Sequence, residues 1–223
     1  YRSLGLAELG SVLHGNRRVD SKAILISFDD GYEDNLLWAM PLLRKFGFTA
    51  IVFVATDLIN QETGSAWKNG DAPGYGRFLT WEQIRTLQAA GVAIGSHTCS
   101  HTLLTTLNED DIAHELENSK RVLTEQLDVN CDFLAYPGGD YDARVLCAAS
   151  QAGYIAGFTT IPGTTGAKTS PYAVRRTEVS ASDSFFIFKM KLAGALDWLS
   201  FKEAAPMRRF IAICNQWVLR MAR

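Results

Sequence analysis

The sequence predicts an α/β fold in which parallel strands alternate with helices, as an open sheet or as a barrel. Two observations point to it. Apolar runs of strand length alternate with segments of helical period along most of the 223 residues. In addition, the first two runs, 23–28 and 49–55, are nearly continuous in Ile, Val, Leu and Phe. Such continuity is typical of parallel strands that are buried on both faces.

Six apolar runs are expected to form the strands, namely 23–28, 49–55, 92–95, 131–136, 154–160 and 172–179. Three helices are expected between them, and each has a recognisable end signal. Thr80 and Gln83 form a capping box that starts the first helix. Asn108 can cap the second, and Gly153 ends the third. The three helices therefore span about 81–90, 109–127 and 140–153.

Composition and charge indicate a globular protein without a nucleic-acid partner. Apolar residues make up 47% of the chain and charged residues 21%, which is close to the globular average. The 22 basic and 24 acidic residues leave a net charge of −2, so no basic surface for nucleic acid is expected. The four cysteines are widely spaced and form no CxxC pair, so we expect buried thiols rather than disulfides or a zinc ribbon.

We expect one domain over 1–223, with a core of about 20–200 and a basic amphipathic helix over 201–223. That helix has five basic residues and one acidic residue, so it could close the fold or lie on a membrane surface. No run of 18 apolar residues predicts a membrane span, and the first twenty residues contain no signal-peptide core. Because the chain begins with Tyr1, we expect a fragment or a processed form, and both the cell envelope and the cytoplasmic membrane face stay open as locations.

Asp29 and Asp30 follow the first expected strand directly. Two adjacent carboxylates at the end of a buried strand are costly unless something pairs with them. In parallel α/β folds the carboxyl ends of the strands are where sites are built. The pair is therefore a candidate for catalysis, and the alternative is that it caps a following helix.

His97 and His101 follow the third expected strand, four residues apart. Two histidines at this spacing lie on one side of a helical turn and can reach one metal ion. Asp30 or Asp29 would complete a set of two histidines and a carboxylate, with positions left open for water and substrate.

A third segment, with Pro137 followed by Gly138 and Gly139, comes at the end of the fourth expected strand. Pro before two glycines predicts a turn. A glycine N–H beside a metal is also a suitable donor to an oxyanion.

These three segments, in this order, resemble the polysaccharide deacetylases of carbohydrate esterase family 4, which have the NodB-like fold. The first motif of that family, T-F-D-D-G, is matched by 27–31, and the second, H-S/T-x-x-H, by 97–101. The stretch 133–142 is similar to the Y-P-Y-G-x-Y segment of the branch that acts on exopolysaccharides and poly-N-acetylglucosamine. The similar portion runs from about residue 23 to 179. The resemblance implies a distorted (β/α)7-type barrel of parallel strands with outer helices.

The resemblance also implies an activity, a hydrolase that removes N-acetyl groups from an amino-sugar polymer or glycan and releases acetate. Asp29 would be the general base, and Asp30, His97 and His101 would hold one divalent metal. The backbone N–H of Gly138 would donate to the oxyanion. Zinc is the default for such nitrogen and oxygen ligands, while iron, nickel or cobalt could bind similar ones.

Two departures from the family pattern concern catalytic groups. The third motif lacks the usual Arg before its Pro, so a guanidinium near the base could come instead from Arg175 or Arg176 on the strand 172–179, and the alternative is that these two are a surface pair on a barrel edge. The family takes its general acid from a late His, and none follows His114 here. His114 falls off the apolar stripe of its helix, and His14 lies in a polar turn. We therefore expect feeble turnover unless an upstream strand adds a His.

Four residues are candidate substrate contacts on the same resemblance and on their aromatic or turn character: Tyr136, Pro137, Tyr141 and Trp67. Two other functions stay open. The missing acid would suit a carbohydrate-binding protein of the same fold with little or no turnover. Two histidines and a carboxylate also describe a non-haem iron oxygenase, although the paired Asp29 and Asp30 argue against it. The oligomeric state stays open.

Overall fold

The computed structural model describes residues 1–17, 19, 22–62, 77–166, 168–195 and 197. The chain divides into two compact units, each described by itself. The first is made of Tyr1–Thr159 and Gly166–Val174, and the second of Thr160–Thr165 and Arg175–Arg223. The expectation of one domain over 1–223 stays a prediction. The basic helix expected over 201–223 lies outside the described residues.

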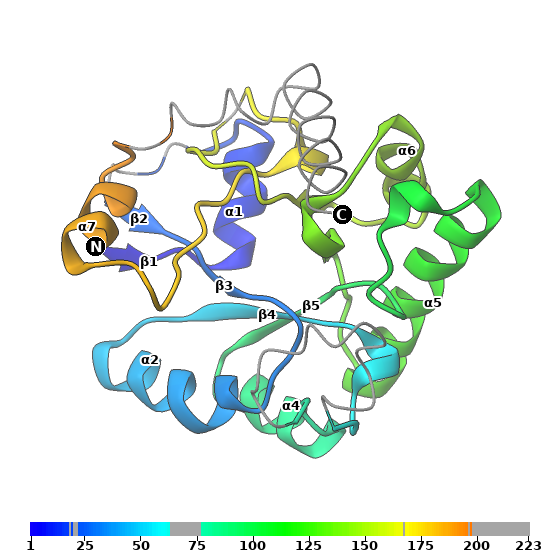
Figure 1. The fold of residues 1–223 in the computed structure, drawn as a ribbon, viewed down its shortest axis with the longest axis horizontal. Coiled ribbons are helices and arrows are strands. Elements are labelled where there is room, and N and C mark those ends of the chain that lie inside the picture. Colours follow the sequence, from blue (N-terminus) through cyan, green and yellow to red (C-terminus); the bar gives the residue numbers. More distant parts are fainter. Residues whose placement is uncertain (18, 20–21, 63–76, 167, 196, 198–223) are drawn as a thin grey trace, which may run out of the picture. The chain divides into compact units, whose positions relative to one another are not determined.

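A curled sheet of five parallel strands forms the centre of the first unit (Figure 1). Its strand order, β3-β4-β5-β6-β7, is the order of the sequence, so every connection crosses over in the same direction. The expected α/β fold of parallel strands with outer helices is confirmed as a half-barrel. A separate parallel pair, β1 and β2, precedes it. The bounds are β1 (Arg2–Ser3), β2 (Ala23–Ile24), β3 (Ile26–Phe28), β4 (Ala50–Val54), β5 (Ala93–Ser96), β6 (Phe133–Ala135) and β7 (Ala156–Phe158).

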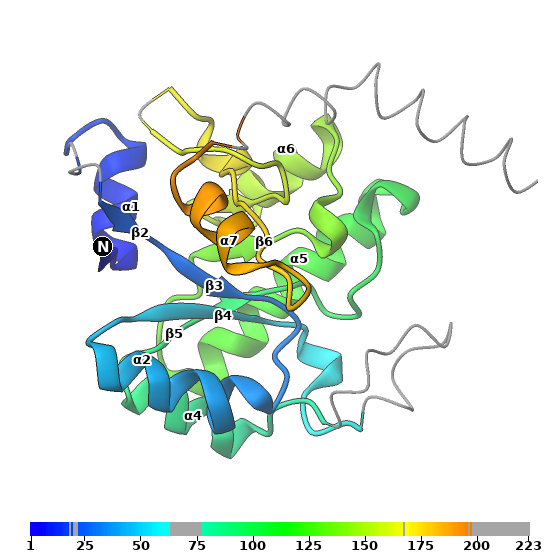
Figure 2. The same ribbon diagram turned by 60° about the vertical axis from the view of Figure 1, so that its left-hand side comes forward.

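Helices pack on both faces of this sheet (Figure 2). The helices of the first unit are α1 (Leu6–Leu13), α2 (Met40–Phe46), α4 (Trp81–Ala89), α5 (Glu109–Leu127) and α6 (Ala143–Gln151). The second unit, described by itself, contains α7 (Phe185–Leu192). Strand β4 shows why both faces need a cover, because its side chains alternate. Val52 and Val54 pack in one apolar cluster with residues of α4, α5 and α6. Ile51 and Phe53 pack in another with residues of α1.

The helix starts follow the capping signals in the sequence. Thr80 and Gln83 form the expected capping box, with each side chain accepting from the backbone N–H of the other. The Asn108 side chain caps α5 by accepting from the N–H of Asp111. Asp142 caps α6, so this helix begins at Ala143, three residues later than about 140.

Two expectations about strands were wrong. The run 172–179 is not a strand among the described residues, since Pro171–Ala173 is a 3₁₀ turn and only Val174 bridges to β7. Beyond it, the backbone N–H of Arg176 donates to Ile161, a loop residue of the second unit, instead of to a neighbouring strand. The run 23–28 is divided between two sheets, and its β3 portion is only partly buried because β3 is an edge strand.

No helix within the described ranges is long and apolar enough to span a membrane.

Candidate metal centre

The carboxyl ends of three strands bring the candidate residues to one edge of the first unit. Asp29 and Asp30 follow β3, His97 follows β5, and Pro137 and Gly138 follow β6. Because these strands run parallel, their carboxyl ends lie on the same side of the sheet. The loops that leave this edge therefore carry all three predicted motifs.

Three of the side chains converge on one point. One carboxylate oxygen of Asp30, Oδ1, lies 3.1 Å from Nε2 of His101 and 3.4 Å from Nε2 of His97. The potential ligand atoms of the three residues all lie within 4.8 Å of one another. Among the residues that the structure describes, this is the one group of three or more His, Cys, Asp or Glu side chains close enough to share a metal ion. The sequence left Asp29 and Asp30 as alternatives, and the geometry places Asp30 with the histidines.

The backbone around these ligands takes left-handed conformations that side chains other than glycine rarely adopt. Asp30 has φ 70°, Thr98 has φ 68° and His101 has φ 61°. Each such residue costs on the order of 1–3 kcal/mol and persists only where its surroundings fix it. Gly31, the next residue, is constrained in two ways. Its φ is 74°, and an added Cβ would lie 2.7 Å from Cγ1 of Val54. The turn therefore needs glycine immediately after the ligand Asp30.

His97 is held by a hydrogen bond on the side of its ring away from Asp30. Its Nδ1 lies 2.7 Å from the carbonyl oxygen of Ala135, and the ring is buried. The carbonyl can only accept, so Nδ1 carries the proton and Nε2 faces Asp30. Second partners of this kind orient metal-binding histidines in proteins.

The loop between the two histidines is held by Glu115 of α5, which the sequence analysis missed. The Glu115 carboxylate accepts from the N–H groups of Cys99 and Ser100, at 2.8 and 2.9 Å. It also accepts from the Ser100 hydroxyl, at 2.6 Å. Within the loop, Oγ1 of Thr98 accepts from the N–H of His101. An available signal was that Glu115 shares the apolar stripe of its helix with Ile112 and Leu116, where a buried acid needs partners.

The charges of the site favour a cation between the three ligands. Burial raises the pKa of Asp30, but the hydrogen bonds from His101 and His97 outweigh it and hold that pKa well below its ordinary value. Burial lowers the pKa of His97, but the hydrogen bond to Asp30 and the negative charge of Asp29 outweigh burial, so the pKa of His97 is raised overall. Two imidazole nitrogens and one carboxylate oxygen, with a cation already favoured between them, fit a divalent metal with open positions.

Asp29 lies next to this set without belonging to it. It is partly buried, and its charge acts on His97, as the raised pKa of that ring shows. The N–H of Gly31 donates to the Asp29 carbonyl, which closes a tight turn with Asp30 at its centre. The predicted role of Asp29 as general base stays a prediction.

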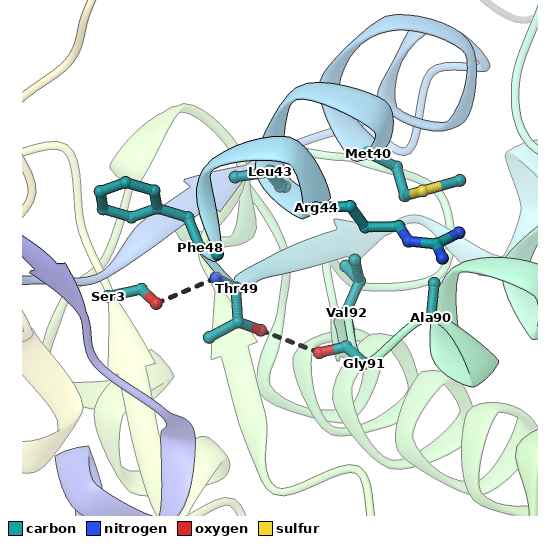
Figure 3. A pocket seen from close by; sticks show the side chains of 10 residues that line it. Ser3, Met40, Leu43, Arg44, Phe48, Thr49, Ala90, Gly91 and Val92 are labelled. Atoms are coloured by element: carbon teal, nitrogen blue, oxygen red, sulfur yellow. Dashed lines mark hydrogen bonds between the residues drawn. The ribbon is translucent and has the colours of Figure 1, made fainter.

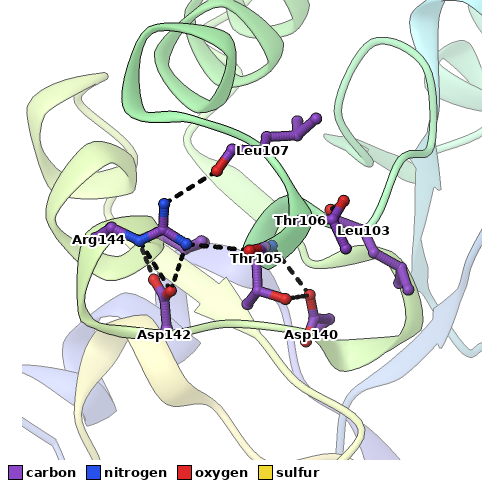
Figure 4. Close-up of polar contacts among 8 residues, drawn as sticks. Leu103, Thr105, Thr106, Leu107, Asp140, Asp142 and Arg144 are labelled. Carbon is purple, nitrogen blue, oxygen red and sulfur yellow. Dashed lines mark hydrogen bonds and ion pairs between the residues drawn. The ribbon is translucent and has the colours of Figure 1, made fainter.

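A polar network fixes the loop that carries Gly138 against the loop after His101 (Figure 4). The Asp140 carboxylate accepts from both the N–H and the hydroxyl of Thr105. Arg144 pairs with Asp142 and donates to the carbonyl of Thr105. Gly138 itself is exposed at φ 62°, as the predicted turn requires. Its role as an oxyanion donor stays a prediction.

The structure describes the other predicted site residues to different extents. Tyr136 is fully buried and its hydroxyl donates to the Tyr172 carbonyl, so its ring packs in the core and has no exposed surface for a sugar. Pro137 is buried as well, whereas Tyr141 is partly exposed and stacks on Tyr136. Arg176 belongs to the second unit, so its position beside the base stays a prediction. Trp67 lies outside the described residues.

The other two histidines lie elsewhere in the first unit. His14 ends α1, is exposed, and bonds the Gly10 carbonyl through Nδ1. His114 is exposed on α5, as its position off the apolar stripe predicted. The source of the general acid stays open.

A cavity of about 310 Å³ lies at the amino ends of the strands, away from the ligands (Figure 3). Thr49, just before β4, bonds there to Ser3 and to the Gly91 carbonyl. Its lining holds no His and no acid, so it offers no comparable chemistry.

The sequence and the fold are similar to those of known proteins. Residues 16–157 match the family Polysaccharide deacetylase. The Bacillus subtilis (strain 168) protein YxkH is 32% identical over 81% of this chain and 60% of its own length. The poly-β-1,6-N-acetyl-D-glucosamine N-deacetylase of Escherichia coli (strain K12) is 26% identical over 44% of this chain. The chain thus spans 60% of the length of the first relative and 15% of the second.

Two solved structures share the fold. The Streptococcus pyogenes deacetylase PplD, in complex with acetate, matches 86% of this chain and 80% of its own, at 27% identity and a TM-score of 0.74. IcaB from Ammonifex degensii matches 86% of this chain and 82% of its own, at 22% identity and a TM-score of 0.72. The second likeness shows the fold alone.

Proposed function

Because the chain belongs to the polysaccharide deacetylase family, we propose that it is a metal-dependent hydrolase that removes N-acetyl groups from an amino-sugar polymer or glycan. The observation that carries the proposal is the convergence of Asp30, His97 and His101, with Asp29 immediately before Asp30 in the chain. A family protein without this set would have no place for the metal.

Each residue of the site has a separate task in the proposed reaction. Asp30, His97 and His101 would hold the divalent ion, which when bound polarises the acetamide carbonyl. Asp29 takes a proton from the water that attacks the carbonyl carbon. The N–H of Gly138 donates to the carbonyl oxygen as negative charge develops on it. Arg176 stays the proposed source of a catalytic guanidinium, on the family resemblance alone.

Zinc is the proposed metal, because nitrogen and oxygen ligands with open positions are typical of catalytic zinc. Iron, nickel and cobalt bind similar ligands and are the alternatives. The proposed substrate is a polymer that contains N-acetylglucosamine, by analogy with the poly-β-1,6-N-acetyl-D-glucosamine N-deacetylase of E. coli. Tyr141 is partly exposed and lies in the segment that follows β6. It is the aromatic residue proposed to contact the sugar.

A second candidate, a carbohydrate-binding protein with little turnover, is favoured by one observation. His14 bonds its own helix and His114 is exposed on α5, so neither has a described contact with Asp30. An acid must protonate the leaving amine, and general acid catalysis is worth about 10²–10⁴ in rate. If the chain supplies no general acid, the protein would bind the carbohydrate but hydrolyse it very slowly.

The experiment measures release of free amine from N-acetylglucosamine oligomers by the protein loaded with zinc. The proposal expects release that a chelator abolishes and that added zinc restores. Binding of the oligomers without amine release would favour the second candidate. Release that survives complete removal of the metal would contradict both the metal site and the proposed reaction.

A further inference from the structure

The helix α2 and the π-helical turn Asn35–Ala39 before it expose apolar side chains on their outward side. The α2 face, as we name it, consists of Leu37, Trp38, Leu42 and Phe46. The exposed fractions of these side chains are 52%, 73%, 57% and 64%. The inward side is apolar too, with Leu36 and Met40 packed against the core. A helix that is apolar all round is normally covered on every side.

The α2 face is large enough to have a function. Two aromatic side chains and two leucines at these exposures offer on the order of 500 Å² of apolar surface, which matches the largest patches on monomeric proteins. Stable protein interfaces bury roughly 800 Å² per partner, so this face alone is small for a dimer contact. Scattered single apolar residues would need no explanation, but four on one short segment do.

The charged residues within the segment 37–47 are all basic. Arg44 and Lys45 are exposed on the same helix, and Lys45 Nζ lies 5.5 Å from the centre of the Phe46 ring. No acidic residue occurs between Leu37 and Gly47. A complementary occupant of this face is therefore anionic.

Two occupants from this chain itself have the wrong charge. A second copy that docks through the same face would place Arg44 and Lys45 against their own equivalents. The segment 201–223 carries five basic residues and one acidic one, so it would add like charges. Like charges that face each other across an interface oppose association.

We propose that the α2 face docks on an anionic lipid bilayer. Helices that lie in the membrane interface combine Trp, Phe and Leu on one side with Lys and Arg beside them, as this face does. The apolar side chains would enter the boundary between headgroups and acyl chains, and the two basic groups would contact lipid phosphates. This inference rests on α2 alone and does not depend on the proposed deacetylase activity.

The test is co-sedimentation of the full chain with vesicles of phosphatidylcholine that contain phosphatidylglycerol. We expect binding that falls at high salt and is weaker on vesicles of phosphatidylcholine alone, because basic groups contribute. Trp38→Glu should weaken binding about tenfold or more, since it buries a charge in place of a ring. Val129→Glu is the matched control, because Val129 is an exposed apolar residue of the first unit outside the α2 face.

Thermal melting of both variants checks that they are folded. Lys45→Glu is a second variant, and we expect it to weaken binding to anionic vesicles with little effect on neutral ones. Equal binding by wild type and Trp38→Glu would overturn the proposal, because another segment, such as 201–223, would then bind the lipid. Absence of binding by the wild type would overturn it too. A concentration-dependent dimer, seen in sedimentation velocity and abolished by Trp38→Glu, would also overturn the proposal.

Discussion

Asp30 and His101 meet across two loops that follow different strands, with 3.1 Å between Oδ1 of the carboxylate and Nε2 of the ring. Both residues have left-handed backbones, at φ 70° and 61°. A local conformation that is unfavourable at each residue is thus stabilised by a long-range pairing. This relationship explains how two residues 71 positions apart in the sequence form one site.

Removing either histidine should remove the metal. His97→Ala and His101→Ala each leave two ligands, which is too few for a tightly held zinc ion. We expect about one metal per wild-type chain and almost none in either variant, measured by elemental analysis after dialysis. His114→Ala, an exposed histidine of α5, is the control that should keep its metal. Full metal content in His97→Ala would contradict the site.

Glu115→Gln should weaken metal binding although it changes none of the three candidate ligands. The amide has one accepting oxygen and no charge, so it cannot accept all three hydrogen bonds that Cys99 and Ser100 donate to the carboxylate. Losses of such outer partners typically cost about 10–100-fold in metal affinity. We expect the zinc dissociation constant to rise by about this factor, measured by competition with a chelator.

Two control variants separate positioning from general destabilisation. Glu117→Gln changes an exposed acid on the same helix and should leave both affinity and stability unchanged. Ser119→Ala removes a buried partner of Ser96 and should lower stability, yet leave zinc affinity near wild type. If Ser119→Ala weakens zinc binding as much as Glu115→Gln, Glu115 has no specific positioning role.

Gly31→Ala should destabilise the protein. The added Cβ would approach Val54 to 2.7 Å, and the positive φ is unfavourable for alanine. We expect a loss of about 1–3 kcal/mol in the free energy of unfolding, measured by urea denaturation. Gly10→Ala is the matched control, because Gly10 lies inside α1 with open space around it. It should be neutral or should stabilise by up to about 1 kcal/mol.

Cysteine reactivity should follow burial. Burial raises the pKa of Cys131 to about 12, so almost no thiolate exists there at pH 8. Cys147 is exposed on α6, so the expectation of a buried thiol was wrong at this position. We expect iodoacetamide at pH 8 to label Cys147 in the folded protein and to label Cys131 only after unfolding, as read by peptide mass spectrometry. Equal labelling rates of the two in the folded state would contradict the described core.

The sequence predicted much of the fold because its signals were local. The continuous apolar run of β4, the capping box at Thr80 and the cap at Asn108 each act within a few residues. The run 172–179 failed because its apolar content is compatible with either a strand or a loop. The backbone beyond Val174 pairs with the loop that contains Ile161, and this pairing determines that the segment is not a strand. No local sequence pattern predicts such a pairing.

The candidate metal ligands were predictable from spacing, whereas the residues that support them were not. His97 and His101 could be found by their separation, and Asp30 only as one of two candidates. Glu115 and the Ala135 carbonyl hold the ligands from α5 and β6, at positions that tertiary packing alone brings near. Tyr136 shows the reverse case, an aromatic residue in a motif that packing directs into the core.

The central claim, that the two adjacent carboxylates have different tasks, is tested most directly by comparing Asp29→Asn with Asp30→Asn. Metal content and amine release from N-acetylglucosamine oligomers are measured on the same zinc-loaded preparations. The account predicts that Asp30→Asn loses the metal and the activity together. Asp29→Asn should keep the metal and lose about 10²–10⁴ in rate, because only proton transfer is removed. Metal content and amine release at wild-type level in both variants would contradict the account.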